Sequence, residues 1–148
     1  MYRTILLATD GSAHARRATK AAVRMARDLR AKVVALNVRP TYASMIAYGG
    51  PEFPIAYGTG EFDRDTRRAS ARILAEVEKL AKAQRVACRP VSITGDETAA
   101  AIIRTAKRQR ADLIVIGSRG RGRVAGFLLG SVAQRVLAGC KIPVLVHH

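Results

Sequence analysis

Residues 113–134 read LIVIGSRGRGRVAGFLLGSVAQ, an apolar, β-rich run that passes through glycines into a helical pattern. Four positions in this stretch have the spacing G-x2-G-x9-G-S: Gly117, Gly120, Gly130 and Ser131. Glycines let a backbone approach a ligand closely, and the unpaired N–H groups at a helix start attract anions. Arg119, Arg121 and Arg123 add positive charge to the same stretch. The stretch therefore predicts a phosphate site and, with it, nucleotide binding.

The helix that follows is expected to begin with a capping box. Ser131 and Gln134 have the S-x-x-Q spacing of that motif. Residues 120–125 also match the G-x-G-x-x-A pattern of dinucleotide folds, which requires a further strand and an acidic residue about 20 positions on. No acid follows Asp112, so we discount that alternative. A second alternative, that this stretch is a glycine- and arginine-rich loop that binds no ligand, is kept.

Five β-rich runs alternate with helical patterns along the whole chain. The runs are residues 4–9, 32–38, 87–94, 112–117 and 143–146, and the helical patterns lie within 15–29, 61–84 and 96–106 and after 131. This alternation predicts one α/β domain over residues 1–148, with a mainly parallel sheet and helices on both faces. The segment 39–60 is interpreted as irregular, either a mobile loop or a lid over a ligand.

A second loop is expected to share the site with the glycine stretch. Ligands of such sheets bind outside the carboxyl ends of the strands, where the winding direction reverses. Asp10-Gly11-Ser12 follows the first strand, as the glycine stretch follows the fourth. Asp10 could accept hydrogen bonds from a ribose or an adenine N–H, hold Mg²⁺ through water, or brace its own loop. Ser12 is predicted to cap the first helix.

Composition limits the class of protein. Hydrophobic residues make up 49% and aromatic residues only 5%, which favours aliphatic helices packed on a sheet. Lys plus Arg number 26 against 11 acids, a net charge of +15, which suits nucleic acid or a small polyanion. Aromatic residues are not interleaved with the cations, so nucleic acid is an unlikely main partner.

Cysteine usage and hydropathy predict a cytoplasmic protein. Cys88 and Cys140 form no C-x-x-C pair, which fits a reducing compartment. No apolar run approaches the ~18 residues of a membrane span, and no signal peptide is expected at the start.

Catalytic motifs are not found. His14 has no Ser or Cys at a recognisable spacing, and is expected at the surface. The sequence has no G-x-S-x-G, H-E-x-x-H or G-x4-G-K-[ST] motif. Asp96-Glu97 is interpreted as an acidic pair at a helix N-terminus. No hydrolytic site is predicted.

The chain resembles the universal stress protein family along its whole length, in particular the branch that binds ATP. The resemblance rests on residues 9–12 (TDGS), on the glycine spacing from Gly117 to Ser131, and on residues 142–146 (IPVLV). It implies an adenine nucleotide alpha hydrolase-like fold: a doubly wound, five-stranded parallel sheet of order 3-2-1-4-5. It also implies a homodimer.

The resemblance further implies roles for individual residues. Asp10 would meet the ribose or adenine, and Val38 would hold the adenine. The phosphate and ribose contacts would come from Gly117, Gly120, Gly130, Ser131 and the Val132 N–H. Ala8 stands where ATP-binding relatives often have proline, and Asp96-Glu97 after Gly95 replaces a common Gly-x-Pro.

The leading hypothesis is an ATP-binding stress or signalling module, accompanied by Mg²⁺, that hydrolyses ATP slowly or not at all. Two alternatives stay open. One is an adenylate-handling enzyme such as an ATP pyrophosphatase, although its S-G-G-x-D-S loop is missing after the first strand. The other is a nucleic-acid-binding accessory protein that uses the arginine excess.

The last strand predicts how the chain assembles. Pro143 cannot donate a ladder hydrogen bond, so its strand should lie at a sheet edge or begin there. Residues 142–146 are apolar, and such an edge is prone to pair with another strand. We expect a homodimer through Pro143–Val146, formed by two-fold pairing.

Overall fold

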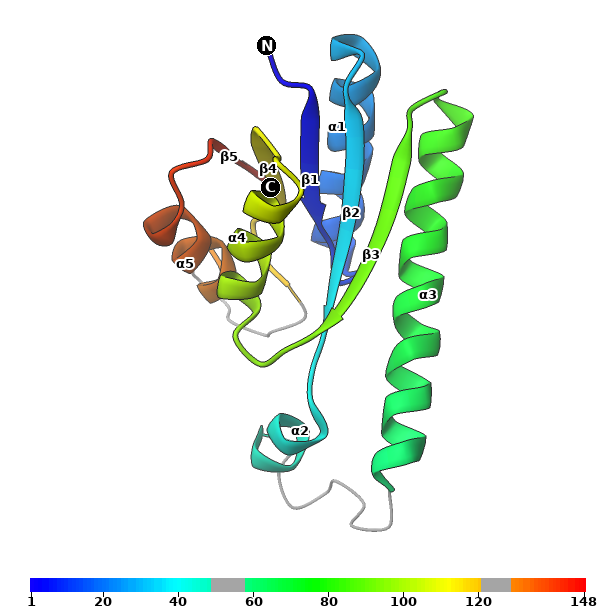
Figure 1. Cartoon of the computed structure of the whole chain (residues 1–148), viewed down its shortest axis with the longest axis vertical. Coiled ribbons are helices and arrows are strands. Elements are labelled where there is room, and N and C mark those ends of the chain that lie inside the picture. Colours follow the sequence, from blue (N-terminus) through cyan, green and yellow to red (C-terminus); the bar gives the residue numbers. More distant parts are fainter. Residues whose placement is uncertain (49–57, 121–128) are drawn as a thin grey trace.

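One parallel sheet organises the molecule (Figure 1). The computed structural model describes residues 1–48, 58–120 and 129–148. The strands are β1 (Thr4–Ala8), β2 (Lys32–Arg39), β3 (Cys88–Thr94), β4 (Leu113–Gly117) and β5 (Val144–His147). They form a five-stranded sheet in the order β3-β2-β1-β4-β5, and every pairing is parallel. The predicted fold class and strand order are confirmed, with strand ends shifted by one residue.

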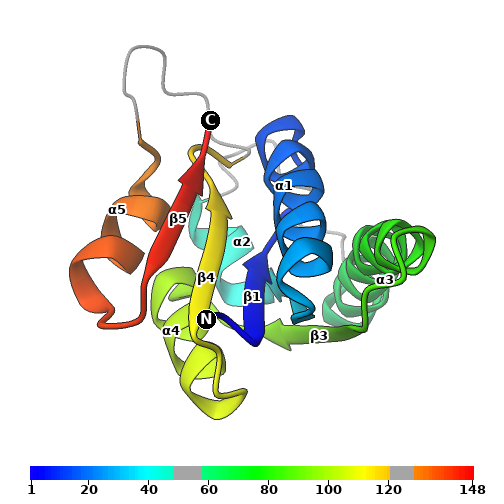
Figure 2. The same ribbon diagram turned by 90° about the horizontal axis from the view of Figure 1, so that it is seen from above.

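Helices cover both faces of the sheet (Figure 2). They are α1 (Ala13–Leu29), α2 (Tyr42–Tyr48), α3 (Thr59–Ala83), α4 (Thr98–Arg108) and α5 (Ser131–Gly139). Ile5 and Leu7 of β1 pack in a core with α1 and α3, whereas Leu6 and Ala8 face the other way, toward α4 and α5. Successive strand residues point to opposite faces, so a strand buried on both sides is apolar throughout. None of the helices in the described ranges is both long and apolar enough to cross a bilayer.

The winding direction reverses between β1 and β4. These neighbouring strands pair from Ile5 with Leu113 to Ala8 with Ile116, so their carboxyl ends lie together. The loops that leave them therefore flank one crevice, as predicted from the sequence. The edge strand β5 begins at Val144, directly after Pro143, which confirms that expectation too.

The prediction of an irregular segment over 39–60 is wrong at both ends. Strand β2 continues to Arg39, and α2 occupies part of the segment. Tertiary contacts order it: the Tyr42 ring packs edge-on against Phe62, with centroids 5.6 Å apart. Residues 49–57, which include Tyr57, lie outside the described residues. The predicted lid falls on this part of the chain.

Asp96 does not act as the helix-terminal acid that the sequence suggested. Its carboxylate accepts hydrogen bonds from the N–H of Thr41 at 3.1 Å and from the Thr41 hydroxyl at 2.7 Å. These bonds, with one from Ser44, lower the pKa of Asp96. Glu97 occupies the cap position of α4 without a side-chain cap bond. Asp96 instead joins the turn before α4 to the turn before α2.

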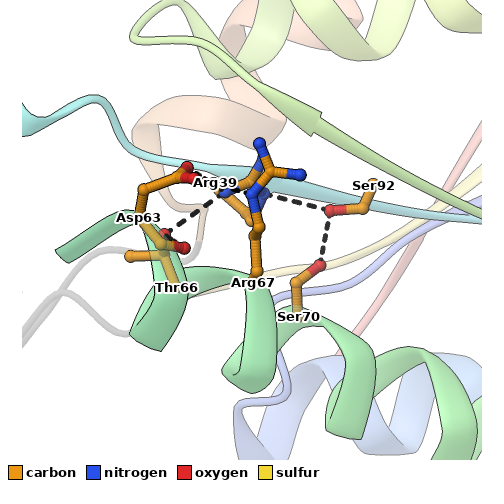
Figure 3. A network of polar contacts seen from close by, with 6 residues as sticks. All are labelled: Arg39, Asp63, Thr66, Arg67, Ser70 and Ser92. Atoms are coloured by element: carbon orange, nitrogen blue, oxygen red, sulfur yellow. Dashed lines mark hydrogen bonds and ion pairs between the residues drawn. The ribbon is translucent and has the colours of Figure 1, made fainter. Parts of the chain in front are cut away.

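A buried arginine fixes the carboxyl end of β2 (Figure 3). The Arg39 side chain is 8% exposed and ion-pairs with Asp63 at 3.1 Å. Its Nε donates to the Ser92 hydroxyl at 3.2 Å. Hydrogen bonds from Arg67 and then from Arg39 lower the pKa of Asp63. This network joins the end of β2 to β3 and to the first turns of α3.

The Cys88 thiol is expected to react slowly in the folded protein. Burial raises its pKa to about 11, with a smaller contribution from the Glu78 charge. Because the thiolate is the nucleophile, only about one molecule in a thousand is reactive at pH 8. Alkylation by iodoacetamide, followed by peptide mass mapping, should be slow at pH 8 and rise about tenfold per pH unit until about pH 11. Equal rates in buffer and in urea at pH 8 would contradict this expectation.

Candidate functional site

A cavity of about 310 Å³ opens at the carboxyl ends of β1, β2 and β4. Every residue that the sequence singled out for a ligand lines it: Ala8, Asp10, Val38, Gly117, Arg119, Gly120, Gly130, Ser131 and Val132. They come from three strands, from the loops that follow β1 and β4, and from the start of α5. The winding reversal between β1 and β4 brings them together. The arginines at 121 and 123 lie outside the described residues.

The turn after β1 is rigidly held. Gly11 has a φ of 75°, a left-handed conformation that favours glycine. The Ser12 N–H donates to Asp10 Oδ1 at 2.9 Å, and the Ser12 hydroxyl accepts from the Ala15 N–H at 3.2 Å. The predicted cap of α1 by Ser12 is therefore confirmed. Asp10 braces its own loop, one of the roles considered for it, while its carboxylate also lines the cavity.

The glycines of the stretch have three different surroundings. A Cβ on Gly117 would lie 3.1 Å from the backbone of His14 and Ala15, so this glycine allows α1 to pack closely on β4. A Cβ on Gly120 would lie 2.9 Å from Asp10 Oδ2. At Gly130 the nearest atoms would be 3.4 Å away, an ordinary contact. Gly117 therefore serves packing as well as lining the cavity.

The predicted capping box at α5 is wrong. Gly130 is the cap residue, with φ −71° and ψ 158°, and among the described residues no side chain caps the helix. The Gly130 N–H donates to the Ser118 carbonyl at 2.7 Å, which places Gly130 ahead of the helix and Ser131 inside it. The Gln134 side chain donates to the Leu129 carbonyl at 2.8 Å instead. The N–H groups of the first turn are thus left to a ligand, beside cavity-lining Ser131 and Val132.

Ser118 is a cavity residue that the sequence prediction missed. It is 1% exposed, and its N–H donates to the His147 carbonyl at 2.7 Å. Its hydroxyl has no hydrogen-bond partner among the residues described. A buried polar group without a partner costs free energy, so this hydroxyl would be stabilised by a ligand or a water molecule that reached it. Its position between Gly117 and Arg119, two predicted site residues, was the sequence signal that could have identified it.

The apolar wall was also missed in part. Leu36, Ile102, Ile116 and Ala133 line the cavity together with Thr98. Leu36 stands two residues before Val38 and so shares its face of β2, a signal that strand alternation offered. Ile102 follows Thr98 by one turn of α4 and shares its side of the helix. The cavity therefore has an apolar side, suited to a flat ring, and a polar side at α5.

The described cavity lining carries one charge of each sign. Among its lining residues only Asp10 and Arg119 carry ionisable side chains. Nearby, His14 Nδ1 accepts a hydrogen bond from Arg17 at 2.7 Å. Burial, then Arg17 and Arg119, lower the pKa of His14, which favours the neutral ring. No group of His, Cys, Asp or Glu in the described ranges could hold a metal ion by itself. The arrangement can bind an anion and a planar apolar group.

Comparisons with known proteins agree with this geometry. A universal stress protein of Thermus aquaticus is 32% identical over 99% of this chain and 98% of its own length. A universal stress protein structure from Burkholderia pseudomallei has a TM-score of 0.76 at 27% identity, covering 98% of this chain and 95% of its own. A universal stress protein solved in complex with cAMP has a TM-score of 0.72 at 26% identity, covering 99% and 97%.

The family model of the universal stress proteins matches residues 1–148, the full length of the chain. Sequence motif, strand order and relatives lead to one conclusion: the chain belongs to the universal stress protein family.

Proposed function

We propose that this protein binds ATP, accompanied by Mg²⁺, in the cavity between β1 and β4, and serves as a stress-response or signalling module in the cytoplasm. The observation that carries the proposal is the uncapped start of α5, which opens onto a cavity whose other side is apolar. A helix N-terminus with free N–H groups attracts phosphate. The relative solved with cAMP supports an adenine nucleotide as the ligand.

The phosphates would lie at the start of α5. Ser131 and the Val132 N–H would bind the β- and γ-phosphates beside Gly130, whose own N–H is held by the Ser118 carbonyl. Arg119 would add a cation that is exposed at the cavity mouth. Gly120, together with Gly117, would face the ribose and the α-phosphate. The Ser118 hydroxyl, which lacks a partner among the described residues, would donate to the bound nucleotide.

The adenine would lie against the apolar wall. Val38 and Leu36 of β2 would cover the ring, with Ala8 in the pocket wall. Ala8 is smaller than the proline common at this position in ATP-binding relatives, which gives the ring more room. Asp10, held in place by its bond to Ser12, would accept hydrogen bonds from the ribose or the adenine N–H.

Mg²⁺ fits this site as a companion of the triphosphate. Mg²⁺ in nucleotide sites is held mainly by phosphates and water, with one or two carboxylates from the protein. Asp10 is the one carboxylate among the cavity-lining residues and could act through water. The ion would neutralise phosphate charge.

Slow or absent hydrolysis fits the side chains at hand. A general base must lie within hydrogen-bond reach of the attacking water. The described lining holds no His, Cys or Lys, and its carboxylate, Asp10, is assigned here to the ribose or the adenine N–H. This chemistry favours a binding module over an adenylate-handling enzyme.

The proposed location in the cytoplasm fits the cysteines. Cys88 and Cys140 are half-buried and unpaired, which suits a reducing compartment.

Mass spectrometry of the nucleotide released from freshly purified protein tests the proposal. We expect an adenine nucleotide that disappears from a Gly120→Val variant purified in parallel. A guanine or pyrimidine nucleotide at comparable occupancy would contradict the adenine assignment. The parallel variant separates a nucleotide held in the cavity from one carried over on the basic surface.

A homodimer through β5 is a second expected result. The carbonyls of Pro143 and His147 accept from β4, so alternation directs the N–H and C=O of Val144 and Val146 to the open edge. Val146→Pro should therefore remove an edge donor without touching the β4 pairing. Sedimentation should find a dimeric wild type and a monomeric variant with unchanged circular dichroism. A monomeric wild type, or a dimeric variant, would show that another surface makes the contact.

A further inference from the structure

An open groove of about 710 Å³ lies along α1, away from the nucleotide cavity. Its lining consists of Tyr2, Arg17, Lys20, Ala21, Arg24, Met25, Asp28, Leu29 and His147. None of these residues lines the cavity, so the groove is a separate feature. Most of its exposed lining is apolar, and its apolar residues Tyr2, Met25 and Leu29 are partly buried against the core. Three cations stand along it.

The cations of the groove form a stripe. Arg17, Lys20 and Arg24 are spaced i, i+3 and i+7, so they share one side of α1 and span about 10 Å along its axis. All three are exposed. Arg17 bonds to His14, whose lowered pKa favours a neutral ring. Lys20 and Arg24 have neither a hydrogen bond nor an ion pair to any described residue.

Other cations of the same helix are compensated. Arg16 pairs with Glu76 of α3 at 3.4 Å, and Arg27 pairs with Asp28 at 2.9 Å. Arg27 also donates to the Gln84 side chain at 2.9 Å. Asp28 is the acid in the groove lining and pairs with Arg27, so none of the three stripe cations has an ion-pair partner among the described residues. Like charges three and four residues apart repel, and a bound polyanion would relieve that repulsion.

We propose that this groove binds the phosphodiester backbone of nucleic acid, independently of base sequence. The proposal goes beyond the nucleotide site and does not rest on it. A concave surface with cations in a row fits a linear polyanion better than a flat lipid surface. Arginine forks suit phosphate oxygens, and the groove lining offers no Asn or Gln to read adenine edges. The +15 charge of the chain then acts through a defined surface.

The test compares two triple variants by fluorescence anisotropy with a labelled 20-base-pair DNA duplex. The groove variant carries Arg17→Gln, Lys20→Gln and Arg24→Gln. The control carries Arg104→Gln, Lys107→Gln and Arg108→Gln on α4. These three residues are exposed, are of the same types, and line neither the groove nor the nucleotide cavity. Both variants lower the net charge by three.

Neutralising about three phosphates changes the log–log salt slope by about 0.9 each. The slope between about 50 and 200 mM salt should therefore be shallower by about 2–3 in the groove variant than in wild type. Affinity at the lower salt should fall at least about tenfold in the groove variant and much less in the control. Saturating ATP should leave duplex binding unchanged. Lys20→Glu should also lower the affinity for the duplex. As a single substitution at an exposed position, it tests the groove even if the triple variant does not fold.

Equal losses in the two triple variants would overturn the proposal, because the charge would then act diffusely. Groove-dependent binding of a polyglutamate peptide as tight as that of the duplex would assign the surface to an acidic protein instead. Groove-dependent binding of anionic phospholipid vesicles, with the duplex unaffected, would assign it to a membrane surface.

Discussion

Gly120→Val is expected to weaken ATP binding at least about 100-fold while the protein stays folded. That factor corresponds to about 2.7 kcal/mol of binding free energy. A Cβ at this position would lie 2.9 Å from Asp10 Oδ2, so the carboxylate must move from its place in the cavity. The added methyl groups would occupy space that the ribose or α-phosphate needs. The obstacle is the end of a side chain and not backbone, so the fold can accommodate it.

Calorimetric titration with ATP measures the effect, and Gly60→Val is the matched control. Gly60 lies exposed in the first turn of α3, outside the cavity lining, and a Cβ there would meet no described atom within 4 Å. The control should keep its affinity within about threefold, less than 1 kcal/mol. Wild-type affinity in Gly120→Val, with normal circular dichroism, would remove Gly120 and Asp10 from the site.

Gly117→Val is expected to act on stability first. A Cβ there would meet the Ala15 nitrogen and the His14 carbonyl carbon at 3.1 Å, and these backbone atoms at the start of α1 cannot give way cheaply. Overpacking of this kind typically costs about 1–3 kcal/mol. For a domain of this size the melting temperature should fall by about 2–4 °C per kcal/mol, hence by about 2–12 °C.

Thermal unfolding followed by circular dichroism checks this, again with Gly60→Val as the control. An unchanged melting temperature in Gly117→Val would mean that α1 does not pack on β4 as described. The contrast with Gly120→Val is informative, because the two glycines belong to the same sequence motif. One variant should lose stability and the other affinity.

Much of the fold was predictable because it depends on local pattern. Alternating β-rich and helical runs give a parallel sheet, and the loops after the first and fourth strands follow from that topology. The residues of the candidate site could be chosen because they stand at strand ends and at a helix start. The structure places all of them around one cavity.

Other features depended on contacts between distant residues. The S-x-x-Q spacing at Ser131 is a genuine local signal, but the bond from the Gly130 N–H to the Ser118 carbonyl moves the cap to the glycine. Spacing alone also cannot distinguish a glycine that leaves room for a ligand from one that lets a helix pack closely. Gly117 is of the second kind, because it lets α1 pack on β4. Arg39 would be expected at the surface, yet Asp63 of α3 and Ser92 of β3 stabilise it in a buried position.

Titration of ¹⁵N-labelled protein with ATP and Mg²⁺, followed by amide NMR spectra, tests the nucleotide site most directly. No substitution is needed, and the signals report where the ligand lies. The amides of Gly120, Ser131 and Val132 should shift most and saturate at one ATP per chain, while GTP should produce smaller shifts. Unchanged spectra for these amides at millimolar ATP, or shifts confined to the basic stripe from Arg17 to Arg24, would contradict an ATP site between β1 and β4.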